Sequence, residues 1–270
     1  MKRLDLVKQE HNTKIGQDCT ATPPNITEDC ILFEDGKPIG FFIESINGKL
    51  KQYIEIANKE FRSKNVPKTK MDRSNVLAIQ RANPGMTRSE ARKLGTSQMS
   101  TILGGIPPKP QFKRPYPTIS SIHNVSSART FIKAMLLACL EAEKVIKDIM
   151  PEQYEFQKKC IEENVPKEFR FGNLFTSSIS NYNISAPFHR DTGNLKGCVN
   201  VIITKKFKAK GGDLHVPDYG ATMDSSDNSL LVYPAWKNIH GVTPIETSSE
   251  DGYRNSLIFY PLKAFKKFVK

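Results

Sequence analysis

Three residues in the second half of the chain have the types and spacing of a mononuclear metal site. His189 and Asp191 form a His-x-Asp pair, and His240 follows much later. In an extended strand alternate side chains point to the same face, so His189 and Asp191 can reach one ion together while Arg190 points away. Two imidazoles and one carboxylate can occupy one face of a six-coordinate Fe(II), which leaves the opposite face open for a chelating co-substrate and O₂. A His-x-Asp pair alone is weak evidence, so the prediction depends on what accompanies it.

An Arg-x-Ser sequence accompanies these residues, at Arg254 to Ser256. A guanidinium on a strand that returns past the metal can donate two parallel hydrogen bonds to a carboxylate. We therefore expect Arg254 to bind the distal carboxylate of 2-oxoglutarate, with the hydroxyl of Ser256 beside it.

The composition is that of a globular protein without a membrane-spanning segment. Of the 270 residues, 38% are hydrophobic and 25% are charged. No apolar run approaches the roughly 18–20 residues that cross a bilayer, and the first residues lack the apolar core of a signal peptide. Five scattered cysteines without a Cys-x-x-Cys motif indicate reduced thiols. We expect an intracellular protein with no membrane partner.

The net charge of +12 predicts a polyanionic partner, most commonly nucleic acid. The alternative is that the lysines only keep the protein soluble. Their clustering favours the first interpretation, and the 109–114 cluster lies among aromatic residues and prolines that could follow a phosphate backbone. The clusters are Lys64, Lys68, Lys70 and Arg73; Arg88, Arg92 and Lys93; Lys109, Lys113 and Arg114; Lys205, Lys206, Lys208 and Lys210; and Lys263, Lys266, Lys267 and Lys270.

Helical patterns dominate the first part of the chain. Residues 1–27 are predicted to be an arm or loop, and Asp-Gly between two apolar runs predicts a β-hairpin over 30–46. Amphipathic or capped helices are predicted over 50–64, 87–94, 128–149 and 151–163, with a short strand over 76–79. Residues 95–122 are rich in glycine and proline, and we expect a long loop there.

Short strands dominate after Phe171. They are predicted over 174–183, 198–204, 213–216, 229–233, 240–243 and 256–260, a spacing typical of a barrel or two-sheet jelly roll. We therefore expect an α+β fold with a double-stranded β-helix core and supporting N-terminal helices. The whole chain is expected to form one domain, in which residues 1–170 supply support and substrate loops and residues 171–270 carry the iron site.

With these residues placed on strands, the chain resembles the Fe(II)/2-oxoglutarate dioxygenases. It is most similar to the TET and J-binding-protein family, which hydroxylates 5-methylpyrimidines in nucleic acid. The segments that carry the resemblance are Phe188–Asn194, Leu214–Pro217, His240–Ile245 and Arg254–Tyr260.

The resemblance implies further roles for single residues. His215 matches a histidine that contacts the co-substrate, and Arg73 falls near an arginine that holds its other end. Asn194 and Tyr260 match residues that contact and stack on the target base. Leu262 stands where the TET enzymes carry a base-contacting histidine.

Strand parity alone predicts that two asparagines face the interior of the barrel. If Asn181 and Asn183 lie on the same strand as His189, their side chains face the barrel interior and can bind co-substrate or substrate.

The function implied is hydroxylation of a methyl group on cytosine or thymine in DNA, using Fe(II), 2-oxoglutarate and O₂. A base inside a duplex must be flipped out, or already be single-stranded, to reach a buried iron. Two alternatives stay open from the sequence: a hydroxylase of a protein or amino-acid side chain, and a non-catalytic nucleic-acid-binding barrel. The sequence leaves the choice between DNA and RNA, and the oligomeric state, undetermined.

Overall fold

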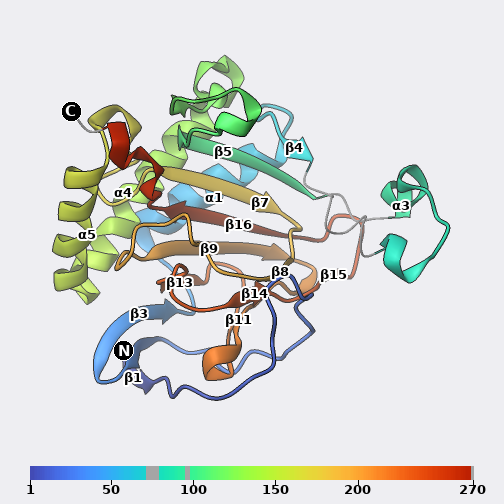
Figure 1. The fold of residues 1–270 in the computed structure, drawn as a ribbon, viewed down its shortest axis with the longest axis horizontal. Helices are drawn as coiled ribbons and strands as arrows, with labels where there is room; N and C mark the ends of the chain where they lie inside the picture. The colour runs from blue at the N-terminus through green and yellow to red at the C-terminus, as the bar shows by residue number, and fades with distance from the viewer. Residues whose placement is uncertain (71–78, 95–97, 269–270) are drawn as a thin grey trace.

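Two packed β-sheets organise the chain, and helices cover the outer face of the larger sheet (Figure 1). The structure is a computed structural model that describes residues 1–70, 79–94 and 98–268. Within these residues, no helix combines the length and apolarity that crossing a membrane requires.

The large sheet contains strands from both halves of the chain. Its spatial order is β1 (Lys2–Asp5), β2 (Cys30–Glu34), β3 (Lys37–Ile43), β13 (Leu230–Tyr233), β9 (Asn200–Phe207), β16 (Tyr253–Tyr260), β7 (Ser177–Tyr182), β5 (Met99–Ile106) and β4 (Thr69–Lys70), and β6 (Thr118–Ile119) pairs with β5. The pairing is antiparallel except between β1 and β2.

The small sheet carries much of the predicted iron site. Its order is β12 (Ala221–Met223), β11 (Leu214–Val216), β14 (His240–Val242) and β8 (Ala186–His189), and a separate ribbon joins β10 (Ala209–Gly211) to β15 (Ile245–Thr247). The helices are α1 (Gly48–Arg62), α3 (Arg88–Leu94), α4 (Arg129–Ile149) and α5 (Pro151–Asn164).

Alternation along β16 shows how the sequence sorts the two faces of the large sheet. Leu257 and Phe259 are fully buried in a core that also contains Phe61 of α1 and Phe131 of α4. Ser256 and Ile258 point to the opposite face, because successive side chains of a strand alternate. Burial of the helical face holds α1 and α4 against the sheet, and the other face is left for the site.

A second core lies between the two sheets. Leu32 and Phe42 from the large sheet pack there with Val216 and Met223 from the small one. This arrangement of two stacked sheets is the jelly roll that the strand spacing predicted.

The predicted loop over 95–122 is wrong, because β5 forms an eight-residue strand of the large sheet within it. Gly104 and Gly105 make this segment look like a loop in the sequence, but close contacts with neighbouring residues leave no space for a side chain at either position. A Cβ on Gly104 would lie 2.6 Å from the carbonyl oxygen of Thr176, and one on Gly105 would lie 2.7 Å from the Phe265 ring. Because glycine has no side chain, the sequence shows no alternation of apolar and polar residues at these positions.

Two other expectations change. The N-terminal residues contain β1 rather than only a loop. Asn181 and Asn183 do not share a strand with His189, because β7 ends at Tyr182 and β8 starts at Ala186. Asn183 has φ +53°, a left-handed conformation that turns the chain between them. Arg73 and the predicted strand over 76–79, apart from Ile79, lie outside the described residues.

Candidate active site

Strand register places the two histidines of the predicted metal site directly opposite each other. His240 on β14 pairs with His189 on β8, and their rings lie 4.4 Å apart between centroids. Asp191 follows two residues after His189, and its Oδ1 lies 3.6 Å from His189 Nε2. The ligand atoms of the three residues all lie within 4.8 Å of one another. The structure thus brings together the triad that the sequence predicted.

Backbone carbonyls fix the orientation of both imidazoles. His189 Nδ1 lies 2.7 Å from the carbonyl oxygen of Pro187, and His240 Nδ1 lies 3.1 Å from that of Asn238. A carbonyl can only accept, so each Nδ1 carries the proton and each Nε2 keeps a lone pair for a metal. Burial, and then the neighbouring His189, lowers the pKa of His240, which favours the neutral ring that metal binding needs.

An asparagine chain that the sequence did not reveal holds Asp191. Asn200 Nδ2 donates to Asp191 Oδ2 at 3.1 Å, and Asn194 Nδ2 donates to Asn200 Oδ1 at 2.9 Å. One carboxylate oxygen is therefore held by Asn200 and the other faces His189. Asn194 is buried and lines the cavity, but its amide nitrogen is already engaged.

Arg254 is a buried cation that lacks a full set of anionic and hydrogen-bonding partners among the described residues. Its side chain is 4% exposed, and its Nε finds no hydrogen-bond partner among the described residues. Burial lowers the pKa of Arg254 to about 10, and Asp213 opposes this shift. Lys206 Nζ also lies 3.8 Å from Asp213, so two cations share one carboxylate. A second carboxylate would balance the charge, and the distal end of 2-oxoglutarate supplies one.

These residues fit an iron ion and 2-oxoglutarate. The two free Nε2 atoms and one carboxylate oxygen form a facial set suited to Fe(II), and Arg254 lies in the same cavity without a partner for its Nε among the described residues. His189, Asp191 and His240 would hold the metal, and Arg254 with Ser256 would hold the co-substrate.

A cavity of about 330 Å³ connects these groups between the two sheets. Apolar side chains from both sheets form much of its wall. It is lined by the three ligand residues, Arg254, Ser256, Asn181, Asn194, Tyr260, Leu262, Ile179, Ile184, Ile202, Ile258, Leu214, Val242, Ala186, Ala235, Gly193 and Asn200. The predicted residues Asn181, Asn194 and Tyr260 are therefore present at the site.

Two predicted residues do not reach the cavity. Leu214 and Val242 line it, whereas His215 alternates to the other face of β11, where its Nδ1 lies 2.8 Å from Thr222 Oγ1. Asn183 instead holds the backbone of Arg254: its Oδ1 accepts from Arg254 N at 2.8 Å, and its own N–H donates to Arg254 O at 2.8 Å. Asn183 thus supports the co-substrate residue without lining the pocket.

A sequence profile described as the oxygenase domain of the 2OGFeDO superfamily, Tet_JBP, matches residues 109–263, more than half of the chain. The chain belongs to this Tet_JBP family. It is accordingly an Fe(II)/2-oxoglutarate-dependent dioxygenase that uses O₂, as the sequence predicted, and this family is catalytic rather than a simple binding barrel.

One solved structure, NgTET1, shows the same fold at low sequence identity, and others match more weakly. NgTET1 in complex with 5mC DNA has a TM-score of 0.59 and 13% identity, over 94% of this chain and 84% of that chain. A putative 2OG-Fe(II) oxygenase from Caulobacter crescentus has a TM-score of 0.43 and 11% identity, over 82% and 77%. An oxidoreductase of the 2OG-Fe(II) oxygenase family from Burkholderia pseudomallei has a TM-score of 0.40 and 13% identity, over 82% and 95%. No curated protein matches the sequence.

Family membership assigns the oxidation to the bound iron and co-substrate, and the chain supplies the geometry. His189, Asp191 and His240 would hold the metal at the wall of the cavity. Arg254 would bind one carboxylate of the co-substrate. The mainly apolar wall would surround the substrate beside these residues.

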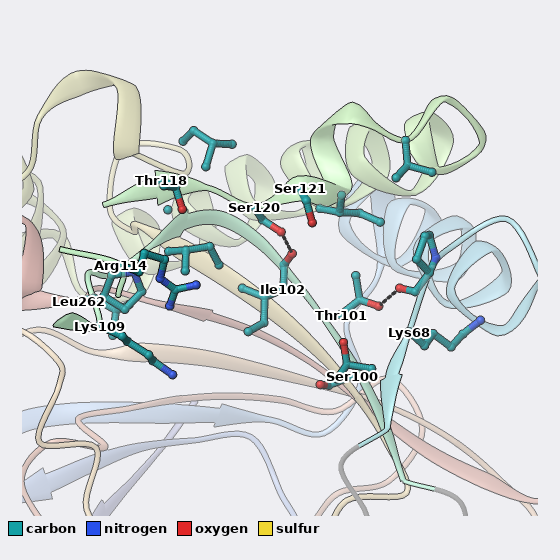
Figure 2. Close-up of a pocket in the computed structure, with 18 of the residues that line it drawn as sticks. Lys68, Ser100, Thr101, Ile102, Lys109, Arg114, Thr118, Ser120, Ser121 and Leu262 are labelled. Carbon is teal, nitrogen blue, oxygen red and sulfur yellow. Dashed lines mark hydrogen bonds between the residues drawn. The ribbon is translucent and has the colours of Figure 1, made fainter. Parts of the chain in front are cut away.

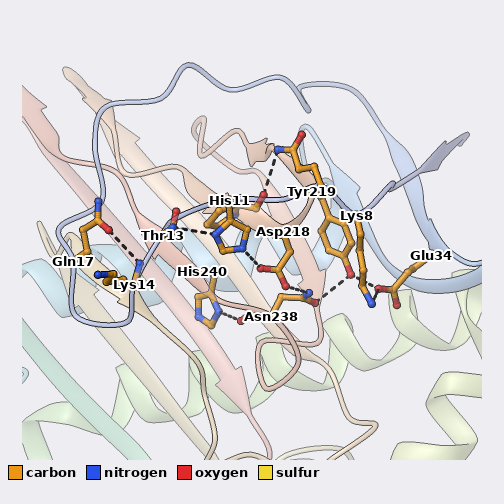
Figure 3. Close-up of polar contacts among 12 residues, drawn as sticks. Lys8, His11, Thr13, Lys14, Gln17, Glu34, Asp218, Tyr219, Asn238 and His240 are labelled. Carbon is orange, nitrogen blue, oxygen red and sulfur yellow. Dashed lines mark hydrogen bonds and ion pairs between the residues drawn. The ribbon is translucent and has the colours of Figure 1, made fainter.

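The N-terminal arm, residues 1–27, braces this Tet_JBP site from outside (Figure 3). His11 Nε2 lies 2.8 Å from Asp218 Oδ1, and Asp218 Oδ2 accepts from Asn238 Nδ2 at 2.5 Å. Asn238 then accepts from His240, a member of the proposed metal triad, through its backbone carbonyl. Tyr233 donates to Asn238 Oδ1 at 3.1 Å. The arm is therefore connected to the metal ligand through two intervening residues.

Replacing Asn238 by alanine keeps the backbone carbonyl that accepts from His240 but removes the side chain that holds this carbonyl in place through Asp218 and Tyr233. Iron binding should therefore weaken by at most roughly tenfold, the lower end of what loss of an orienting partner costs. His11→Ala should have a smaller effect of the same sign. Anaerobic titration with Fe(II) measures both, with Thr13→Ala as the arm control. A variant that melts at a lower temperature but binds Fe(II) normally would show that Asn238 only stabilises the fold.

Replacing Gly212 by alanine should raise the 2-oxoglutarate requirement. Gly212 has φ +77°, and its added Cβ would lie 2.9 Å from Arg254 Nε, so the guanidinium must move. Gly36→Ala is a matched control, since Gly36 has φ +73° and no atom within 4 Å of the added Cβ. Both changes strain the backbone by about 1 kcal/mol. Only Gly212→Ala should change the apparent KM measured by succinate formation; equal KM values would contradict the contact.

Proposed function

We propose that this dioxygenase hydroxylates the methyl group of a 5-methylpyrimidine, 5-methylcytosine or thymine, in DNA. The observation that carries the proposal is the cavity itself. It joins the three triad residues to a mainly apolar wall that also carries the Tyr260 ring and the Asn194 amide. An apolar wall suits a methyl group, a ring can stack on a base, and the Asn194 oxygen can accept from a base edge.

The charge of the chain supports a nucleic-acid substrate, although three lysines of one predicted cluster are paired within the protein. Lys205 Nζ donates to Asp227 and Asn228 at 2.9 and 2.8 Å, and Lys208 pairs with Asp251 at 3.2 Å. Lys206 lies beside Asp213. These three lysines have partners within the protein. The basic residues of the 109–114 segment, beside the cavity, are therefore better placed to contact phosphates.

The similarity to NgTET1 in complex with 5mC DNA supports the same substrate class for this chain. Leu262 lines the cavity where the TET enzymes are expected to carry a histidine, so cytosine and thymine stay as two candidate bases. A cavity of this size between two sheets admits a base only after it has left the duplex.

The test is nucleoside mass spectrometry. The protein is incubated with Fe(II), 2-oxoglutarate, ascorbate and DNA that contains both thymine and 5-methylcytosine. A hydroxymethyl nucleoside supports the proposal and identifies the base. If only succinate appears, and only when a protein or amino-acid extract is added, the substrate is a protein or small molecule and the proposal is wrong.

A further inference from the structure

A groove of about 680 Å³ runs beside the iron cavity, over strand β5 (Figure 2). We call it the β5 groove. Tyr260 and Leu262 line both spaces, so these two residues form the wall that the cavity and the groove share. A ligand that fills the β5 groove therefore ends next to the iron cavity.

The two spaces also share one face of the large sheet. Pairing aligns Ile202 of β9 with Ile258 of β16, Ile258 with Ile179 of β7, and Ile179 with Ile102 of β5. The first three isoleucines line the iron cavity and the fourth lines the groove. Ile102 is 37% exposed although its strand lies within the sheet. The sheet surface thus continues from the buried cavity to an open platform.

Two cations face each other on the segment above this platform. Lys109 and Arg114 form an isolated antiparallel bridge, in which Lys109 N donates to Arg114 O at 2.7 Å and Arg114 N donates to Lys109 O at 3.3 Å. Lys113, in a left-handed conformation with φ +57°, turns the chain between them. Like charges directly opposite each other repel. An anion between them would turn that repulsion into attraction.

Arg114 also has an unmet hydrogen bond. Its Nε is buried and finds no partner among the described residues. Hydroxyl groups of Ser100, Thr118 and Ser121 line the same groove, and the residues described along it include no carboxylate. Lys68 does not add to this charge, because its Nζ donates to the carbonyl oxygens of Ser63 and Val66.

We propose that the β5 groove binds the sugar–phosphate backbone on one side of the target nucleotide, with a phosphodiester between Lys109 and Arg114. The strand lies single-stranded or locally opened over Ile102, and its base enters the iron cavity past Tyr260. This inference rests on the proposed function for its substrate, and adds which side of the cavity the strand enters from and which residues hold it. An acidic peptide is the competing occupant, but the exposed Ile102 platform and the opposed cations suit alternating bases and phosphates better.

The test measures binding of a fluorescent single-stranded oligonucleotide that contains one 5-methylcytosine or thymine in a defined context. A series of strands carries one neutral methylphosphonate linkage, moved stepwise across the target. Wild-type protein loaded with Mn(II) and 2-oxoglutarate without O₂ should lose roughly tenfold in affinity at one linkage on one side of the target, since one charged hydrogen-bonded contact is removed.

The variants locate that linkage in the structure. Arg114→Ala and Lys109→Ala should each bind the unmodified strand roughly tenfold more weakly and lose the response to the neutral linkage. Each should also lower the salt dependence of binding by about one counterion. Arg114→Lys should recover part of the affinity. Lys133→Ala removes an exposed charge from α4 and should change none of these values.

The outcomes separate this inference from the proposed function. If wild type hydroxylates the base but Arg114→Ala and Lys109→Ala respond to the neutral linkage as wild type does, the groove assignment is wrong and the function stands. If the strand binds with the expected response but no hydroxymethyl product forms, the groove stands and the reaction is wrong. If a polyglutamate peptide binds through Arg114 and the oligonucleotide does not, the occupant is an acidic protein segment.

Discussion

Asp191→Ala should abolish turnover while leaving nucleic-acid binding almost unchanged. Asp191 is the only carboxylate in the described triad, so its loss leaves two neutral imidazoles to hold a dication. Removing a residue that merely orients a ligand costs about 10- to 100-fold in metal affinity, so loss of the ligand itself should cost more than about 100-fold. The Nδ2 of Asn200 would also lose its acceptor. Anaerobic Fe(II) titration and succinate formation measure the two effects.

Asp148→Ala is the matched control, because it removes one exposed carboxylate from α4. It should retain both iron binding and turnover. Retention of turnover by Asp191→Ala at saturating Fe(II) would show that the metal is held elsewhere. Equal loss of oligonucleotide affinity and iron affinity would show instead that the fold, rather than the site, had failed.

Arg254→Lys should raise the apparent KM for 2-oxoglutarate by roughly tenfold to a hundredfold. A lysine keeps the charge but cannot donate two parallel hydrogen bonds, and a hydrogen bond to a charged group contributes about 1.5–3 kcal/mol. The shorter, non-planar head would also leave space where the buried guanidinium lies along Gly212. The measurement is succinate formation at varied 2-oxoglutarate.

The expected signature is a change in the co-substrate requirement with little change in Fe(II) affinity. The control is Lys147→Arg, an exposed substitution on α4. Lys206→Arg is unsuitable because Lys206 lies beside Asp213, which also faces Arg254. An unchanged KM for 2-oxoglutarate in Arg254→Lys would assign the distal carboxylate to another cation.

The residues that do chemistry could be predicted from sequence because their spacing follows strand geometry. His189, His240 and Arg254 lie on strands and Asp191 lies two residues past the end of β8, and the structure brings all four to one cavity. The residues that hold them leave no such pattern. Asn200 supports Asp191 from another strand, so its role appears only when the chain has folded.

Predictions of side-chain direction and of strand position from the sequence are wrong at three places in this chain. Parity places Asn183 on the strand of His189, but a left-handed residue resets the parity between β7 and β8. His215 matches a family histidine by position, yet alternation from Leu214 turns it away from the cavity. The sequence of β5 resembles a loop because its glycines permit close packing instead of displaying a pattern.

The N-terminal arm also forms hydrogen bonds with the edge strand of the small sheet. β8 is the last strand of that sheet, and an unpaired edge invites pairing with another chain. Gly16 N donates to Phe188 O at 2.8 Å, and Phe188 N donates to Gln17 O at 2.8 Å, so the arm satisfies this edge one residue before His189. Gly16 and Gln17 thus occupy the edge of the strand that carries His189, so the arm covers a strand edge that could otherwise pair with another chain.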